Sequence, residues 1–303
     1  MQNPQDLLPI LAGFPRPNWE SISQIVERSP ESDWNKLWED WARTWVDATA
    51  ETLGRPYRVS ESDNFLLLTA QDDRYADLLS AFLERTLRKI LSMLDGIASD
   101  DGFGKNVVLM FNDQESYYQY MSYFYPEEGE FILSSGVFLN SDYGHFALPF
   151  LEMSAAEATS AHEMTHACLR HLPIPLWLNE GFAVTVEEEI CGYLPLEMTN
   201  ERFAEHAQFW NSETIQEFWS GFSFNRTDEG SELSYELARF CVKALAHDYD
   251  VFSNFANGAS FEDGGESAAI NAFGGSLGGL IQQFFGDGDW SPKPTEWRSD
   301  DAS

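Results

Sequence analysis

Hydrophobic residues in the first half of the chain follow both helical and extended spacings. Four tryptophans share one helical stripe and predict an amphipathic helix over 33–48: Trp34, Trp38, Trp41 and Trp45. Because large apolar stripes usually pack, we expect this helix to dock on the rest of the fold. Short apolar runs predict strands at 65–69, 107–111, 131–139 and 146–148. Longer amphipathic segments predict helices at 73–97, 116–124 and 154–171.

The second half of the chain has a largely helical pattern. Apolar residues at helical spacing predict helices at 197–210, 212–219, 234–248, 268–273 and 276–285. From Gly286 onward the sequence is polar and contains proline, which predicts a disordered tail. The expected fold class is α+β, with a mixed sheet, one central helix and a mostly helical C-terminal lobe. The expected division is an N-terminal helical region at 1–60, an α/β subdomain at 61–190, a helical subdomain at 191–286 and a tail at 287–303.

Acidic residues dominate the charge of the chain. Of its 303 residues, 50 are Asp or Glu and 18 are Lys or Arg, which gives a net charge of −32. Such a surface repels nucleic acid and anionic membranes, so we expect neither as a partner. No apolar run approaches the ~20 residues of a membrane span, and the N-terminus lacks the basic start and apolar stretch of a signal peptide. Three cysteines without metal-ligand spacing fit reduced thiols, and these features together predict a cytoplasmic protein.

The chemistry of the sequence is concentrated in residues 162–166, which read His-Glu-Met-Thr-His. Two histidines four residues apart lie on one helix face, about one turn from each other, so both imidazoles can bind one cation. Glu163 projects beside that cation and can accept a proton from a water molecule that the cation activates. The alternative is a surface helix with two solvated histidines, and the small apolar residues of the predicted helix disfavour it.

Glu180 is the expected third ligand, and it lies in the segment 177–183, which reads Trp-Leu-Asn-Glu-Gly-Phe-Ala. After His166 the first helix continues for about five residues, or roughly 7–8 Å, and Pro173 and Pro175 then impose a turn. A second helix beginning near Leu176 returns over a similar length and sets Glu180 level with His166. The other interpretation is a first-turn glutamate favoured by the helix dipole. Together with His162, these side chains predict a site for one Zn²⁺ ion.

These two segments resemble the zinc motifs of the gluzincin metallopeptidases, and the short gap between them is similar to that of compact peptidase-MA-like domains. The resemblance covers roughly residues 107–186 and implies a zincin-like catalytic fold. It implies that His162, His166 and Glu180 hold the zinc ion and that Glu163 is the catalytic base. Many gluzincins also place a tyrosine on a later helix to stabilise the oxyanion, and Tyr235 corresponds to it by the order of elements. The other interpretation of Tyr235 is a packed helix residue.

The segment 136–140, Gly-Val-Phe-Leu-Asn, stands where related aminopeptidases carry Gly-x-Met-Glu-Asn. In those enzymes the glutamate binds the free amine of the substrate, whereas this chain has Leu139 at that position. An apolar residue cannot bind an ammonium group, so the resemblance implies a peptidase that is not an aminopeptidase. The strand itself is interpreted either as a surface that pairs with an extended peptide or as a plain core strand.

The expected function is zinc-dependent hydrolysis of peptide bonds, with a peptide or protein as the substrate. Two other classes stay open: a zinc-fold protein that binds peptides with little catalysis, and a zinc hydrolase that acts on a non-peptide substrate. The sequence does not fix the oligomeric state. Four further histidines have no partner at ligand spacing and are expected on the surface or in the core: His145, His171, His206 and His247.

Overall fold

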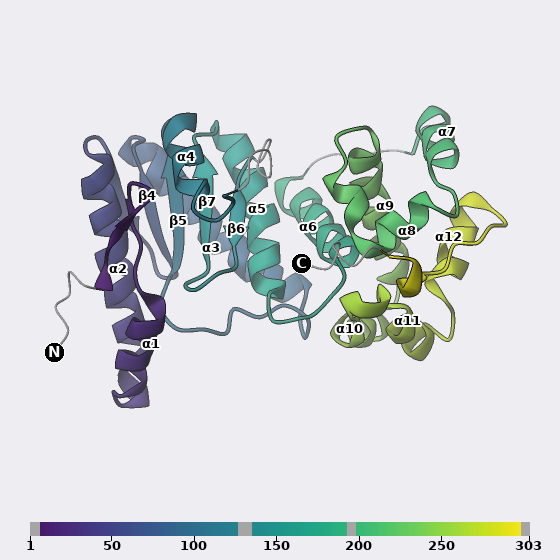
Figure 1. Cartoon of the computed structure of the whole chain (residues 1–303), viewed down its shortest axis with the longest axis horizontal. Coiled ribbons are helices and arrows are strands. Elements are labelled where there is room, and N and C mark those ends of the chain that lie inside the picture. Colours follow the sequence, from purple (N-terminus) through teal and green to yellow (C-terminus); the bar gives the residue numbers. More distant parts are fainter. Residues whose placement is uncertain (1–6, 127–134, 193–197, 298–303) are drawn as a thin grey trace. The chain divides into compact units, whose positions relative to one another are not determined.

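The computed structural model describes residues 7–126, 135–192 and 198–297, and the chain divides into two compact units (Figure 1). One unit comprises residues 1–92 and 100–167, and the other comprises 93–99 and 168–303. The first unit contains a mixed five-stranded sheet and its helices, and the described part of the second is built from helices, so the fold class is α+β. Among the helices that the structure describes, none combines the length and the apolar character needed to cross a membrane.

The sheet unit begins with a small hairpin and two helices: β1 (Ile10–Leu11), β2 (Phe14–Pro15), α1 (Trp19–Glu27) and α2 (Trp34–Leu53). The strands of its main sheet are β3 (Arg58–Glu61), β4 (Phe65–Thr69), β5 (Asn106–Phe111), β6 (Val137–Leu139) and β7 (His145–Pro149). Its other helices are α3 (Asp73–Met93), α4 (Gln114–Met121) and α5 (Met153–Leu169). Asn18 and Asp113 begin α1 and α4 by accepting a hydrogen bond from the amide three residues later.

The strands of the main sheet lie in the order β3-β4-β5-β7-β6. β4, β5 and β7 run parallel, and the edge strands β3 and β6 pair antiparallel with β4 and β7. β4 confirms the strand predicted at 65–69, and all five of its residues are buried, as expected for a central parallel strand. The strand predicted at 131–139 is confirmed only at 137–139, and residues 131–134 lie outside the described part of the chain.

The tryptophan helix α2 forms one wall of the core of the sheet unit, and in Figure 1 α2 and α5 flank the sheet on opposite sides. The ring of Trp45 is buried and meets Trp19 edge-on at 5.5 Å and His145 at 4.9 Å. The predicted docking of this helix is therefore confirmed. Residues 1–60 lie in the sheet unit, and the two compact units divide at residue 167, inside α5. The expected division at 60 and 190 stays a prediction.

The helical unit contains seven α-helices in its described part: α6 (Leu176–Cys191), α7 (Asn200–Phe209), α8 (Thr214–Ser220), α9 (Gly230–Leu245), α10 (Tyr249–Gly258), α11 (Glu266–Phe273) and α12 (Leu277–Phe285). Trp177 anchors the start of α6, because its buried ring lies 5.5 Å from Trp219 and 6.3 Å from Phe255. Its indole N–H donates a hydrogen bond to the Gly264 carbonyl at 2.9 Å. An aromatic core with a satisfied indole therefore fixes the position at which α6 begins.

Residues 287–297 correct the expectation of a disordered tail. Trp290 is 8% exposed, and its carbonyl accepts a hydrogen bond from the indole of Trp219 at 2.8 Å. The side chain of Gln216 donates to the Ser291 carbonyl at 2.9 Å. One large buried ring and these hydrogen bonds order a segment whose composition is polar. Residues 298–303 lie outside the described part of the chain.

Glu236 on α9 forms a buried charged cluster with two residues of α7. Arg202 donates to its carboxylate through Nε at 2.8 Å and Nη2 at 2.9 Å, and Nε2 of His206 lies 3.0 Å away. Burial alone would raise the pKa of Glu236, but hydrogen bonds from His206 and Arg202 outweigh burial and lower the pKa to about 2. The folded protein therefore prefers the charged carboxylate, and that preference adds to its stability.

We expect Glu236→Gln to lower the free energy of unfolding by about 3 kcal/mol at pH 6. The folded-state pKa of Glu236 lies below its ordinary value of 4.5, so the contribution is complete above pH 4.5 and is lost as the pH falls toward about 2. Urea unfolding of both proteins at pH 6 and pH 3 should show the difference shrink by about 2 kcal/mol. The same difference at both pH values would contradict this account.

Candidate metal centre

Helix α5 presents its two predicted ligands on a partly exposed face. His162, Glu163 and His166 are half-buried, whereas Met164 and Cys168 are buried. This division follows from the helical period, because residues four apart share a face and the residues between them point elsewhere. Cys168 is buried, so it lies off the partly exposed face that carries the two histidines.

The segment 177–183 holds Glu180 in place by burying the residues around it. The buried members of the segment are Trp177, Leu178, Gly181, Phe182 and Ala183. Glu180 itself is half-buried, although its Oε2 atom is shielded from solvent. The apolar residues of the segment therefore fix the rotation of α6, and that rotation sets the direction of the Glu180 carboxylate.

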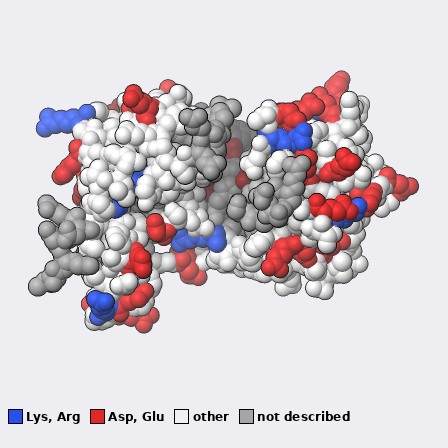
Figure 2. All heavy atoms as spheres, viewed as in Figure 1, with Lys and Arg blue, Asp and Glu red and all other residues white. Residues whose placement is uncertain are grey.

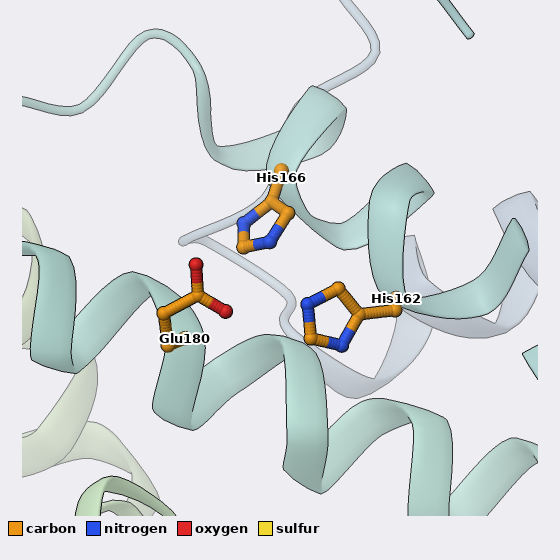
Figure 3. A group of neighbouring side chains, drawn as sticks. All are labelled: His162, His166 and Glu180. Atoms are coloured by element: carbon orange, nitrogen blue, oxygen red, sulfur yellow. The ribbon is translucent and has the colours of Figure 1, made fainter. Parts of the chain in front are cut away.

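Three side chains from α5 and α6 converge (Figure 3). His162, His166 and Glu180 each offer one ligand atom, and these atoms all lie within 4.8 Å of one another. The two imidazole rings have their centroids 4.8 Å apart and are inclined at 77°. Figure 3 shows the carboxylate of Glu180 pointing toward both rings. The structure therefore brings these three residues together, and their role as metal ligands stays a prediction.

The donor set of this cluster suits a small divalent cation that accepts nitrogen and oxygen ligands. Two imidazole nitrogens and one carboxylate oxygen are a ligand set found in catalytic zinc sites, which keep a fourth position for water or substrate. The separations of the three ligand atoms leave space for one cation among them. The cluster contains no thiolate, so it does not resemble the four-ligand structural zinc sites that cysteines build.

Glu163 is held by the main chain of the edge strand. Its Oε2 accepts a hydrogen bond from the N–H of Phe138 at 2.7 Å. Phe138 lies opposite Phe146 in the antiparallel pair of β6 with β7, and β6 is the outermost strand of the sheet. This contact holds the carboxylate of Glu163 against the main chain of β6. Sequence reasoning missed it, because no local pattern links residues that are 25 positions apart.

Tyr235 lies on α9, and its predicted role stays a prediction. Its half-buried ring meets Phe224 edge-on at 5.2 Å. Ala238, about one turn further along α9, lies against Gly181 of α6, so Tyr235 is on the helix that packs beside the residue after Glu180.

Leu139 is 4% exposed and belongs to the core of the sheet unit. Position 139 therefore presents no polar group that could bind a substrate amine. Its neighbour Phe138 lies on the opposite side of the strand, with its ring centroid 5.1 Å from that of Phe146. The strand β6 thus combines a buried core residue with a main-chain donor at the edge of the sheet.

Gly181 permits the close approach of α6 and α9. A Cβ atom at position 181 would lie 2.7 Å from the carbonyl oxygen of Ala238 and 2.6 Å from Cγ2 of Val242. Because the Ala238 oxygen belongs to the backbone, the two helices would have to separate. Two turns further along α6, Glu188 accepts hydrogen bonds from Arg239 at 2.8 Å and Lys243 at 2.7 Å. The glycine after Glu180 is therefore required by packing.

We expect Gly181→Ala to lower the free energy of unfolding by about 1–3 kcal/mol, as overpacking typically does. The displaced helix carries Glu180, so zinc affinity should fall as well. Urea unfolding and zinc titration measure the two effects. Gly258→Ala is the matched control, because a Cβ there would lie 3.6 Å from the nearest heavy atom, Cβ of Ala268. Equal stability of the two variants would show that the contact at 181 is not restrictive.

No protein-family model matches the sequence, and no curated protein matches it either. A functional conclusion for this chain therefore depends on the convergence of His162, His166 and Glu180 and on the hydrogen bond that holds Glu163.

Proposed function

We propose that this chain is a zinc-dependent peptidase with a zincin-like catalytic unit of the gluzincin type. The observation that carries the proposal is the convergence of His162, His166 and Glu180 from two consecutive helices. A zinc ion bound by these residues would supply the positive charge that activates a water molecule and polarises the scissile carbonyl. The site would hold one ion, and we assign it as zinc because two imidazole nitrogens and one carboxylate oxygen suit that metal.

Glu163 is the proposed general base. Its carboxylate accepts the proton of the attacking water and then delivers it to the leaving amine. The hydrogen bond from the Phe138 N–H supports this role, because it holds one carboxylate oxygen of Glu163 in place. Tyr235 is the proposed donor to the oxyanion, and a phenol hydroxyl in that position would stabilise the developing charge.

The proposed substrate is a peptide or an unfolded protein segment. An extended chain can pair with an exposed sheet edge through main-chain hydrogen bonds, and β6 is an edge strand next to Glu163. On the face shown in Figure 2, acidic side chains cover larger areas than basic ones, in keeping with 50 acidic and 18 basic residues. This charge favours cationic peptides and disfavours nucleic acid as a partner.

We expect the zinc-loaded protein to cleave a peptide with a blocked N-terminus as fast as the same peptide with a free one. Leu139 is buried, so position 139 offers no carboxylate to a substrate ammonium group. Mass spectrometry of the products from paired acetylated and free peptides, with unfolded casein as a general substrate, measures this directly. A strict requirement for the free amine would contradict the prediction. Absence of cleavage in every peptide would favour a peptide-binding protein or a hydrolase of another substrate.

A further inference from the structure

Arg16 is a buried cation surrounded by aromatic rings in the sheet unit. Arg16 is only 6% exposed to solvent. The carbon at the centre of its guanidinium group lies 3.9 Å from the ring centroid of Tyr120, 4.6 Å from that of Tyr123 and 4.8 Å from that of Phe124. Such contacts attract a cation to the ring faces, but an aromatic ring face does not replace hydrogen-bond acceptors for the N–H groups.

The hydrogen bonds of Arg16 are incomplete within the described part of the chain. Nη2 donates to the Tyr120 carbonyl at 2.8 Å, whereas Nε and Nη1 are buried and have no hydrogen-bond partner there. Burial lowers the pKa of Arg16, which shows that its charged form is poorly solvated. Leaving charged donors buried without acceptors is costly, so an acceptor at this position would be strongly favoured.

No described carboxylate forms an ion pair with Arg16, although the chain has 50 acidic residues for 18 basic ones. The neighbouring histidine adds no second charge. His145 is buried, its Nδ1 lies 2.9 Å from the Tyr143 carbonyl, and its Nε2 lies 2.7 Å from the Tyr120 hydroxyl. Burial lowers the pKa of His145 to about 4, so the ring is neutral at physiological pH. Arg16 is therefore the one cation among the described residues that line this site.

Arg16 lines a small cavity of about 30 Å³ that also touches Tyr120, Tyr123, Ser141 and Asp142. A space of this size accommodates about two water-sized groups, because each needs ~10–15 Å³. Ser141 and Asp142 are exposed, so the cavity has an outer rim that solvent reaches. The dimensions admit a halide ion or the two oxygens of a carboxylate group, and they are too small for a nucleotide phosphate or a large organic acid.

We propose that Arg16 and its aromatic surroundings form a binding site for one compact monoanion, either a halide ion or a carboxylate group. The anion accepts hydrogen bonds from Nε and Nη1, which are the donors without partners, and it neutralises the buried guanidinium. Nη2 of Arg16 donates a hydrogen bond to the Tyr120 carbonyl in α4. An anion that stabilises the buried guanidinium therefore also stabilises this contact between the Arg16 segment and α4. The anion is thus a stabilising ligand of the sheet unit and is independent of the proposed metal centre.

Urea unfolding in sodium bromide or sodium formate, compared with Arg16→Met in the same salts, tests this site. A ligand of the folded state raises the folding equilibrium constant about elevenfold when its concentration is ten times its Kd. Wild type should show a gain that follows this saturable form, and Arg16→Met should show only the general salt effect. Arg28→Met is the matched control, because Arg28 is exposed and the charge change is the same. Asp142→Asn should tighten binding, because it removes a negative charge from the rim.

Crystals of the wild-type protein soaked in sodium bromide provide a second measurement that does not depend on a variant folding. An anomalous peak within hydrogen-bond distance of Arg16 Nε or Nη1 supports the site, and displacement of that peak by formate identifies the carboxylate as the stronger ligand. The absence of a peak at Arg16, with water in the cavity, overturns the proposal. The proposal is equally overturned if wild type and Arg16→Met respond to bromide and formate in the same way.

Discussion

Replacing Glu163 with glutamine should lower the rate of peptide cleavage by roughly 10²- to 10⁴-fold, the usual contribution of a positioned proton-transfer group. Glutamine has nearly the same shape, and its amide oxygen can still accept the hydrogen bond from the Phe138 N–H, which spans 2.7 Å in the structure. It cannot accept a proton from water at neutral pH. Because Glu163 is not one of the three converging ligands, zinc content should stay at one ion per chain.

The measurement pairs kcat on a blocked peptide with zinc content after dialysis. Glu152→Gln is the matched control. It makes the same chemical change at an exposed residue immediately before α5, outside the site. Near-normal turnover in Glu163→Gln would rule out the proposed base. Loss of zinc together with turnover would make Glu163 a ligand instead, and the assignment of Glu180 would then have to change.

The elements that position the candidate site were predictable where one local signal was strong. The strand at 65–69 is a continuous apolar run, and the structure places β4 at the same residues. The helix that carries His162 and His166 was predicted at 154–171 and is observed at Met153–Leu169. The position of Glu180 level with His166 was predictable, because the turn between their two consecutive helices is short and helix geometry fixes the rise along each one.

Other elements lacked a local signal. The hairpin of β1 and β2 has two residues in each strand, too few for an alternating pattern to be visible. α10 was missed because the apolar spacing of α9 continues into it, and the predicted helix at 234–248 ended on Asp248, which is the residue that caps α10. The tail at 287–297 is polar on average, and it is ordered by the burial of Trp290 and by hydrogen bonds to its main chain from distant residues.

The contact between Glu163 and the Phe138 N–H shows why a site is harder to predict than its helix. The motif identifies Glu163, but the contact depends on the register of β6 with β7, in which Phe138 lies opposite Phe146. A shift of one residue would turn that N–H to the other side of the strand. Register is set by packing between distant segments, so a single sequence reveals the chemistry of the residue and not the group that holds it.

Replacing Glu180 with alanine should weaken zinc binding by at least about 100-fold, since even partners that only orient ligands contribute ~10- to 100-fold to metal affinity. Glu180 is the one anionic member of the cluster, and without it two neutral imidazoles would have to hold a doubly charged ion. Competition against a fluorescent zinc chelator measures the affinity. Peptide cleavage at limiting zinc should fall in parallel, because the fraction of loaded protein falls.

Two further variants separate the loss of a ligand from a general effect on α6. Glu189→Ala removes an exposed glutamate from the same helix and should bind zinc as the wild type does. Glu180→Asp keeps the charge but shortens its reach, so its affinity should lie between those of wild type and Glu180→Ala. Unfolding in urea without zinc should be similar for all of them, because Glu180 is not part of the apolar core of α6. Equal zinc affinity in Glu180→Ala and Glu189→Ala would mean that the third ligand lies elsewhere and that the convergence with His162 and His166 is not a metal site.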